Sequence, residues 1–370
     1  MNIIVSGGGT GGHIYPAVTI IRTIQKKFPD AKFLYVGTAR GLEADIIPKE
    51  GLPFVTVDIR GFERHLTPVN LLRAGKAMAG VIKAAKIVRD FRPDAVVGTG
   101  GYVCGPILLA ASLMHIPTLI QEQNVVPGIT NKILSRFVTR VAAGTEEAVK
   151  FFPADKVLFT GNPIRSEVLT ADREDGAKAY GFNPSKKTVL ISGGSRGARA
   201  INRAMIDILV QAAKNPEVQY LHVTGKNEYE DVMRRLHEAG FAPEDTKHIQ
   251  IRPYVYDMPK AMAMADLAVF RAGATGLAEL TARGIPSILI PYPYAAENHQ
   301  EHNARALEKA GAARMILNRE LTSERLYAVL AELLSEEDKL KAMAEASRRL
   351  GRPQAAEDIA DLVLGLAARR

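Results

Sequence analysis

Two glycine-rich segments, about half a chain apart, hold the residues whose types and spacing best fit chemistry on a ligand. The first, GGGTGGH at residues 7–13, follows an apolar run at residues 3–5, and the second, GGSRG at residues 193–197, follows an apolar run at residues 189–191. Glycines let backbone N–H groups approach a ligand, and the start of a helix favours negative charge. The first segment therefore fits an anion or sugar oxygens, and the second, through Ser195 and its amides, fits a phosphate. The alternative is that the glycines only tighten turns between strands and helices.

Two side chains near these segments could act on or bind a substrate. His13 follows the first glycine segment directly, where an exposed imidazole can take a proton near neutral pH. Glu279, in the segment FRAGATGLAE, is expected one turn into a helix, where its carboxylate can accept both hydroxyls of a ribose. The alternatives are a histidine that only bonds its own loop and a glutamate that is solvated or caps the helix. We expect Arg165 and Gln300 on the same rim.

The first glycine segment also has the GxGxxG spacing of dinucleotide-binding enzymes, at Gly7, Gly9 and Gly12. Such an enzyme uses an acidic residue at the end of its second strand to hold the ribose hydroxyls. The run KFLYVGTARGLE places Gly37 and Thr38 at that point. The sequence therefore argues against a dinucleotide-dependent dehydrogenase.

Metal chemistry finds little support in the sequence. No Asp-x-Asp pair of the kind that bridges a cation to a diphosphate is present, and the histidines are scattered. We therefore expect no metal and no other cofactor. The charge of a leaving group would then be met by helix N-termini, backbone amides and Arg165. Neither GxSxG nor CxxC occurs, so the corresponding nucleophile and redox chemistries are not indicated.

Short apolar runs alternate with helical patterns along the chain, which predicts an α/β protein with two doubly wound, Rossmann-like domains and parallel sheets. Besides residues 3–5, the predicted strands lie within residues 32–37, 53–59, 94–100, 117–123, 140–145, 188–194, 219–225, 248–255, 266–273 and 286–292. Residues 80–93 and 200–216 are long enough for crossover helices. Ligands of open sheets bind beyond the carboxyl ends of the strands, so we expect one cleft between the domains.

A break in composition near residues 158–187 indicates the boundary between the two domains. We expect a first domain at residues 1–162, a second at residues 163–350, and a last helix at residues 351–370 that either caps the second domain or braces the first. The hinge between the domains is expected near Asn162.

Composition limits the classes of function. The chain has 370 residues, of which 47% are hydrophobic and 24% charged, as in a globular protein with two cores. Its single cysteine, Cys104, excludes an internal disulfide and is predicted to be a core residue. The net charge of +8 is spread over the chain, and 6% aromatics without Trp argue against a nucleic-acid partner.

Neither secretion nor a membrane span is expected. The first residues run directly into a strand and a glycine loop, without the pattern of a signal peptide. Residues 95–121 lack formal charge apart from a possible charge on His115, but glycines and prolines divide them into a strand, a loop, a short helix and another strand. A buried βαβ unit is therefore predicted there.

Seven motifs resemble those of the MurG family of peptidoglycan glycosyltransferases: GGGTGGHIYPA, GTGGYVCGP, QEQNVVPG, TGNPIR, SGGSRGAR, FRAGATGLAE and the segment around Gln300. Their order and spacing match over essentially the whole chain. The resemblance implies the two-domain GT-B architecture. It also implies an inverting, metal-independent transfer of N-acetylglucosamine (GlcNAc) from UDP-GlcNAc to the C4 hydroxyl of the muramyl sugar of lipid I, which forms lipid II.

The resemblance further implies roles for individual residues. His13 would be the general base, with Tyr102 and Glu122 beside the acceptor. Ser195 and its neighbouring amides would hold the diphosphate with Arg165 nearby, and Glu279 would take the ribose hydroxyls. The implied UDP-GlcNAc contacts are Thr10, Gly11, Gly12, Asn124, Arg165, Ser195, Val255, Ala274, Thr275, Gly276, Leu277, Ala278, Glu279 and Gln300. Of these, Thr10, Gly11 and Gly12 would also line the acceptor, and the backbone near Val255 would read the uracil.

Lipid I is anchored in the bilayer, so the resemblance implies peripheral docking on the anionic cytoplasmic leaflet of a bacterial cell membrane. Residues 64–89 mix apolar and basic side chains that suit such a surface. The expected contacts are Leu71, Leu72, Arg73, Lys76, Met78 and Val81. The alternative is an ordinary crossover helix with a solvated basic face.

Two other functions stay open at this point. A UDP-GlcNAc 2-epimerase, or another nucleotide-sugar enzyme of the GT-B type, would share the architecture and the nucleotide site. It would not need the acceptor motifs GTGGY and QEQN. A non-catalytic module would bind UDP without turnover.

Overall fold

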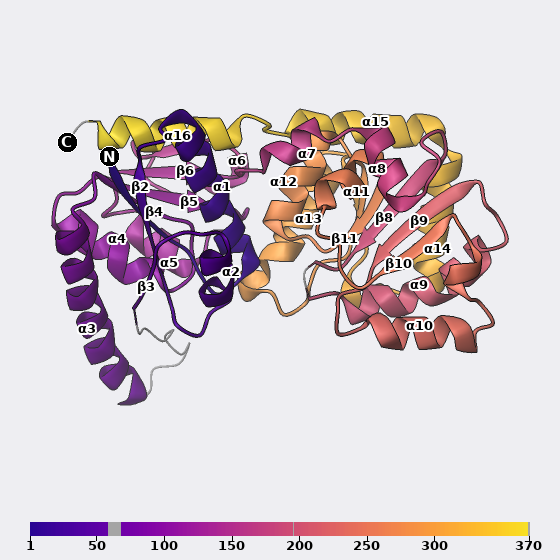
Figure 1. The fold of residues 1–370 in the computed structure, drawn as a ribbon, viewed down its shortest axis with the longest axis horizontal. Coiled ribbons are helices and arrows are strands. Elements are labelled where there is room, and N and C mark those ends of the chain that lie inside the picture. Colours follow the sequence, from indigo (N-terminus) through magenta and orange to yellow (C-terminus); the bar gives the residue numbers. More distant parts are fainter. Residues whose placement is uncertain (58–67, 195, 369–370) are drawn as a thin grey trace. The chain divides into compact units, whose positions relative to one another are not determined.

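The computed structural model describes residues 1–57, 68–194 and 196–368, and for residues 68–78 it describes only the helical backbone. Within this part of the chain the fold consists of two compact units. Unit 1 is Met1–Ile164 together with Gln354–Arg370, and unit 2 is Arg165–Pro353. Each unit is built on a parallel sheet with helices on both faces (Figure 1).

Unit 1 contains a seven-stranded sheet in the order β3-β2-β1-β4-β5-β6-β7. Its strands are β1 (Asn2–Ser6), β2 (Lys32–Gly37), β3 (Phe54–Thr56), β4 (Ala95–Gly98), β5 (Thr118–Glu122), β6 (Arg140–Ala143) and β7 (Val157–Phe159). Its helices are α1 (Gly11–Lys27), α2 (Glu43–Lys49), α3 (Pro68–Phe91), α4 (Cys104–Leu113), α5 (Ile129–Leu134), α6 (Glu146–Val149) and α16 (Ala355–Ala367).

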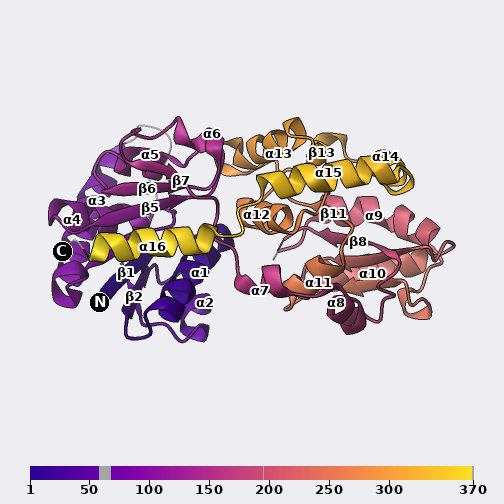
Figure 2. The ribbon, with the colours of Figure 1, turned by 90° about the horizontal axis from the view of Figure 1, so that it is seen from above.

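The sheet of unit 1 is buried on both faces, as the near-continuous apolar strands require. One core lies between the sheet and the helices α1 and α16, and α16 contributes Ile359 and Val363 to it (Figure 2). The other core lies between the sheet and the helices α3 and α4, and includes Cys104. The predicted βαβ unit at residues 95–121 is confirmed as β4, α4 and β5. No helix in the described ranges is long and apolar enough to cross a membrane.

Unit 2 contains a six-stranded sheet in the order β10-β9-β8-β11-β12-β13. Its strands are β8 (Lys187–Ser192), β9 (Val218–Val223), β10 (Ile249–Arg252), β11 (Leu267–Phe270), β12 (Ser287–Leu289) and β13 (Ala313–Met315). Its α-helices are α7 (Ser166–Thr170), α8 (Arg173–Tyr180), α9 (Arg199–Ala212), α10 (Tyr229–Glu238), α11 (Met258–Met264), α12 (Ala274–Arg283), α13 (His299–Lys309), α14 (Ser323–Ser335) and α15 (Glu337–Leu350). Three short 3-10 turns are η1 (Pro243–Asp245), η2 (Ala296–Asn298) and η3 (Asn318–Glu320).

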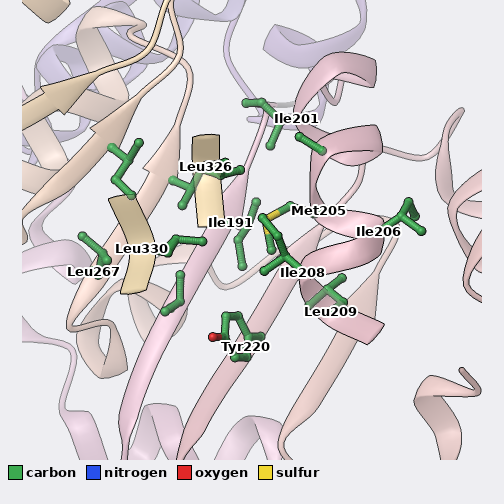
Figure 3. Packing of buried hydrophobic residues seen from close by; sticks show 14 of the residues in the cluster. Ile191, Ile201, Met205, Ile206, Ile208, Leu209, Tyr220, Leu267, Leu326 and Leu330 are labelled. Atoms are coloured by element: carbon green, nitrogen blue, oxygen red, sulfur yellow. The ribbon is translucent and has the colours of Figure 1, made fainter. Parts of the chain in front are cut away.

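The amphipathic helix α9 forms much of one core of unit 2. Its apolar face packs Ile201, Met205 and Leu209 toward the sheet, with Ile191 of β8 and Leu326 of α14 in the same cluster (Figure 3). This packing fixes the start of α9, which directly follows the second glycine segment. The glycine segment that is expected to bind a phosphate is therefore followed by a helix that is anchored in the core.

Sequence reasoning found eleven of these strands and missed β7 and β13, which have three residues each. The apolar run of β7 is only three residues long, and two of these residues are exposed, whereas β13 carries a central arginine. Both are shorter than the runs of four to eight residues that predict a strand. The helix α12 begins at Ala274, which puts Glu279 in its second turn.

Candidate functional site

In unit 1 the strand order reverses between β1 and β4, which pair side by side although β2 and β3 lie between them in the sequence. In an open parallel sheet such a reversal leaves a crevice at the carboxyl ends of the strands, where ligands bind. The first glycine segment follows β1, and residues 99–103 follow β4. Both segments therefore lie at this crevice, together with the turn that follows β5.

His13 lies in the first turn of α1 and is half-buried. Its Nδ1 is 2.9 Å from the carbonyl oxygen of Gly8. A carbonyl oxygen only accepts hydrogen bonds, so Nδ1 must carry the proton in this contact, and the neutral ring keeps its lone pair on Nε2. Gly100 lies close to the same ring: a Cβ at this position would be 3.0 Å from Nε2. The ring is thus fixed with its basic nitrogen away from Gly8.

The backbone of His13 is tied to a buried polar network. Thr99 donates its hydroxyl to the carbonyl oxygen of His13 at 2.7 Å, and Gln123 donates its amide to the carbonyl oxygen of Thr99 at 2.7 Å. Asn162 in turn donates to the carbonyl oxygen of Gln123 at 2.9 Å and accepts from Gln121 at 2.9 Å. The expected hinge residue Asn162 is therefore held inside unit 1, and unit 2 begins at Arg165.

Glu122, expected beside the acceptor, ends β5 and is only 1% exposed. One carboxylate oxygen accepts the backbone and side-chain N–H groups of Asn124 at 2.9 and 3.1 Å. The other accepts from Asn131 at 2.7 Å and from the backbone of Gly128 at 3.3 Å. These contacts shape the turn after β5, so the carboxylate supports Asn124 in the site. A direct catalytic role for Glu122 stays a prediction.

The other residues expected in unit 1 reach its surface. Tyr102 follows β4 with 41% of its surface exposed, and Thr10 and Gly12 are exposed at the start of α1, next to the partly exposed Gly11. These residues lie on the segments that follow β1 and β4, where a ligand can reach them. They are accessible in a way that Glu122 is not.

Glu43, the first residue of α2, is a site residue that sequence reasoning missed. Its side chain is fully buried, and its carboxylate accepts the backbone N–H of Gly9 at 3.1 Å. It also accepts the backbone N–H and the hydroxyl of Thr38 at 3.0 and 2.7 Å. The negative charge under the first glycine segment disfavours an anion there. Of the two ligands expected for this segment, sugar oxygens therefore fit better.

In unit 2 the strand order reverses between β8 and β11, so the second glycine segment and the start of α12 lie at one crevice. Gly197 adopts φ +75°, and a Cβ there would lie 2.1 Å from the carbonyl oxygen of Thr224. Gly194 adopts φ +86°. Glycine is thus required at Gly197 for close packing of two backbone segments. Ser195, the expected diphosphate ligand, lies outside the described residues.

A buried histidine, His222, contributes to the hydrogen bonds that hold the segment packed against Gly197. His222 of β9 is fully buried, and its Nε2 is 3.0 Å from Oδ1 of Asn202. The amide of Asn202 donates to the carbonyl oxygen of Thr224 at 2.9 Å, so its oxygen faces His222 and accepts from Nε2. Burial lowers the pKa of His222 to about 3, so the ring is neutral. Asn202 thereby links α9 to the segment that packs on Gly197.

Arg165 and Glu279 form an ion pair at the start of unit 2. The guanidinium donates through Nε and Nη2 to one oxygen, Oε1, of Glu279 at 3.1 and 2.9 Å. Burial raises the pKa of the Glu279 carboxyl above its ordinary value, and Arg165 opposes this effect. Both hydrogen bonds use Oε1, and among the described residues none reaches Oε2, so this second oxygen can accept a ligand hydroxyl. The pair brings together the two residues expected at the ribose and the diphosphate.

The remaining residues of unit 2 that are expected to contact UDP-GlcNAc follow the carboxyl ends of its strands. The hydroxyl oxygen of Thr275, in the first turn of α12, is buried without a partner among the described residues, as expected for a group that a ligand satisfies. Val255 lies in the loop after β10, and its neighbours in sequence, Tyr254 and Tyr256, pack their rings edge to face. Gln300 accepts the backbone N–H of Tyr292 at 2.9 Å, which leaves its amide N–H groups for donation.

The expected UDP-GlcNAc contacts thus fall into two groups. Thr10, Gly11, Gly12 and Asn124 belong to unit 1, and Arg165, Val255, residues 274–279 and Gln300 belong to unit 2. Of the expected membrane contacts, the side chains of Leu71, Leu72, Arg73, Lys76 and Met78 lie outside the described residues, and Val81 is partly exposed on α3. Within the described residues, no three histidine, cysteine or acidic side chains gather as a metal site would require.

Both units match the domain models of one known protein family. The model of the glycosyltransferase family 28 N-terminal domain matches residues 3–143, and the model of the C-terminal domain matches residues 188–362. A protein of Listeria welshimeri, the UDP-N-acetylglucosamine--N-acetylmuramyl-(pentapeptide) pyrophosphoryl-undecaprenol N-acetylglucosamine transferase, is 49% identical over 99% of both chains. The transferase of the same name from Desulforamulus reducens is 48% identical over 97% of both chains.

Solved structures agree with these sequence relatives. The crystal structure of MurG from Acinetobacter baumannii is similar with a TM-score of 0.79 and 30% identity, and the match covers 98% of this chain and 99% of that one. A UDP-N-acetylglucosamine 2-epimerase has a TM-score of 0.66 over 100% of this chain and 97% of its own, at 17% identity. At that identity the likeness to the epimerase shows the fold alone.

Proposed function

Since the chain belongs to glycosyltransferase family 28 and, within it, to the MurG transferases, we propose that unit 1 binds the lipid acceptor and unit 2 binds UDP-GlcNAc. The reaction is the transfer of GlcNAc to N-acetylmuramyl-(pentapeptide) pyrophosphoryl-undecaprenol, lipid I, which forms lipid II. The observation that carries the division is the separation of two chemistries. Unit 1 presents an imidazole that is oriented by the first glycine segment, which a buried carboxylate holds, and unit 2 presents helix starts and a guanidinium.

In unit 2 the donor is held through its nucleotide and its diphosphate. The free oxygen of Glu279 accepts a ribose hydroxyl, and the backbone of Val255 reads the edge of the uracil. Ser195, the amides at the starts of α9 and α12, and Arg165 offset the charge of the diphosphate. Asn124 from unit 1 and Gln300 from unit 2 bind the sugar or its phosphates.

In unit 1, Nε2 of His13 is the general base. It takes the proton of the C4 hydroxyl of the muramyl sugar as the oxygen forms a bond to C1 of GlcNAc. The bond between C1 and the diphosphate oxygen breaks, and UDP leaves with the electron pair on the opposite face. The configuration at C1 is therefore inverted. Because base and leaving group lie on opposite faces, the two units must close on the substrates.

Preorganised donors stabilise the leaving diphosphate without a bound cation in this proposal. The test uses the purified full chain, labelled UDP-GlcNAc and a lipid I analogue, with and without a chelator of divalent cations. We expect UDP release and labelled lipid II at the same rate in both conditions. UDP release no faster than in the control without acceptor would refute the transferase, and a chelator effect that magnesium reverses would refute metal independence.

We also propose that the enzyme is a peripheral protein on the cytoplasmic side of the bacterial membrane. Support comes from exposed apolar side chains on the helices α3, α4 and α5 of unit 1 and in the segments that directly follow α4 and α5; α4 packs against both α3 and α5. These side chains are Ile82, Leu113, Met114, Ile129, Ile133 and Phe137, which range from 40% to 66% exposed. Exposed or partly exposed basic residues lie among them, namely Lys83, Lys86, Arg89, Lys132 and Arg136. Apolar side chains among cations suit the interface of an anionic bilayer.

A further inference from the structure

We propose that Glu43 is a positioning residue for His13. It holds the first glycine segment in the conformation whose Gly8 carbonyl fixes the imidazole with Nε2 unprotonated. The inference rests on the proposed role of His13 as general base. It adds to the site a residue that does not touch the substrate and that lies outside the seven motifs that mark the family in this sequence.

Glu43 is coupled to His13 through two consecutive residues, Gly8 and Gly9. The carboxylate accepts the N–H of Gly9 at 3.1 Å, and the preceding carbonyl, that of Gly8, accepts from Nδ1 of His13 at 2.9 Å. These two hydrogen bonds orient the two sides of one peptide unit, since the Gly8 carbonyl and the Gly9 N–H belong to the same planar amide. A rotation of that amide would break both bonds together.

Three glycines leave the space that the Glu43 side chain occupies. Positions 8, 37 and 41 are all glycine, and a Cβ at any of them would lie 2.1 to 2.6 Å from an atom of the Glu43 side chain. Such distances are far inside van der Waals contact. Three separate segments, after β1, at the end of β2 and before α2, therefore close around one side chain. The side chain is fully buried there.

The groups around the Glu43 side chain favour a carboxylate over the corresponding amide. All three groups that contact it, the Gly9 N–H, the Thr38 N–H and the Thr38 hydroxyl, donate to it. The Thr38 hydroxyl also accepts from the backbone N–H of Gly41 at 3.1 Å, so its own proton is directed at Glu43. A glutamine would have to point its NH₂ group at one of the two backbone N–H donors. A buried donor facing a donor loses the hydrogen bond and leaves both groups unsatisfied.

Glu43 differs from an acidic residue that binds a ligand. A dinucleotide-binding fold uses an acid at the end of its second strand to hold ribose hydroxyls. Glu43 follows that strand by a few residues, but it is fully buried and its contacts are with the protein backbone and Thr38. It therefore acts on the reaction only through the glycine segment and His13.

The experiment compares Glu43→Gln with Glu50→Gln, the same substitution at the end of the same helix. Glu50 is partly exposed and pairs with Arg22, away from the glycine segment. We expect Glu43→Gln to lower kcat about 10- to 100-fold, as a misplaced general base does, with the KM for UDP-GlcNAc and the affinity for UDP within about twofold of the wild type. Glu50→Gln is expected to keep kcat within about twofold.

A second readout observes the imidazole itself. In protein with ¹⁵N-labelled histidine at about pH 8, above the ordinary range for imidazole, the His13 signals should show Nδ1 protonated and Nε2 unprotonated. The signals are identified by their loss in His13→Ala. We expect Glu43→Gln to shift them toward the tautomer with the proton on Nε2. A substitution that only lowers stability would leave the tautomer of the folded protein unchanged.

Thr38→Val covers the case in which Glu43→Gln does not fold. It removes one of the three donors to the carboxylate and leaves the Gly9 contact, so we expect a smaller loss of kcat, about 3- to 10-fold, with the same constant KM. Glu43→Gln, or Thr38→Val in its place, with unchanged kcat or with reduced kcat and an unchanged His13 tautomer would overturn the proposal. If His13→Ala itself turns over normally, the proposed function fails instead, so the two failures are distinguishable.

Discussion

Replacing Gly100 by alanine should disable the reaction without touching the donor site. A Cβ at this position would lie 2.8 Å from Cδ2 and 3.0 Å from Nε2 of His13. Ordinary contacts between carbon atoms are about 3.5 to 4.0 Å, so the ring would have to move by roughly 1 Å. A displacement of about 1 Å in a catalytic group costs on the order of 100-fold in rate, which corresponds to about 2.7 kcal/mol. We therefore expect kcat to fall about 100-fold, while the affinity for UDP is unchanged.

The backbone contributes a separate effect that a control variant removes. Gly100 adopts φ +110°, and an alanine with positive φ costs about 1 to 3 kcal/mol of folding free energy. Gly51, in the same unit, adopts φ +68° with nothing within 4 Å of its would-be Cβ. Gly51→Ala should therefore lose stability in urea unfolding but keep its kcat. The reasoning is refuted if Gly100→Ala retains kcat within about threefold of Gly51→Ala.

Three further predictions concern stability and membrane binding. Burial lowers the pKa of His222 to about 3, so below about pH 6.5 the unfolded chain binds a proton that the folded protein does not. Between pH 7 and 4 the wild type should therefore lose about 3 kcal/mol of unfolding free energy relative to His222→Gln. Unfolding free energies of the two proteins that change in parallel with pH would contradict this. Because the pKa of Glu279 is raised in the folded state, the wild type should lose stability relative to Glu279→Gln as pH rises from about 4 to 7, and a gain would contradict the burial effect. Ile133→Glu should reduce sedimentation with anionic vesicles several-fold, whereas Leu169→Glu, an exposed position in unit 2, should not, and equal effects would place the docking surface elsewhere.

The sequence allowed much of the fold, and the position of the glycine segments within it, to be predicted, because both depend on local patterns. Buried parallel strands show as apolar runs, and glycine segments after β1 and β8 mark the carboxyl ends where ligands bind. The strands β7 and β13 were missed because they are edge strands of only three residues each, shorter than the runs that predict a strand. A short edge strand forms because it pairs with a neighbouring strand in space, and this neighbour is not part of the local sequence.

The contacts inside the site could not be predicted in the same way. The position of His13 after the glycines was visible, but its tautomer depends on where the Gly8 carbonyl points. The role of Glu43 depends on three glycines that are brought together only by folding. Glu122 was expected beside the acceptor. In the structure it is buried and accepts hydrogen bonds from Asn124 and Asn131, an arrangement that depends on the folded turn after β5.

The central claim is that proton removal in unit 1 and nucleotide binding in unit 2 are separate tasks of separate residues. The most direct measurement determines kcat with UDP-GlcNAc and a lipid I analogue, and the affinity for UDP, for His13→Ala and Glu279→Ala in parallel. We predict that His13→Ala loses kcat by about 100-fold or more with UDP affinity unchanged, and that Glu279→Ala mainly weakens UDP binding. An equal loss of UDP affinity in both variants, or normal turnover of His13→Ala, would contradict the account.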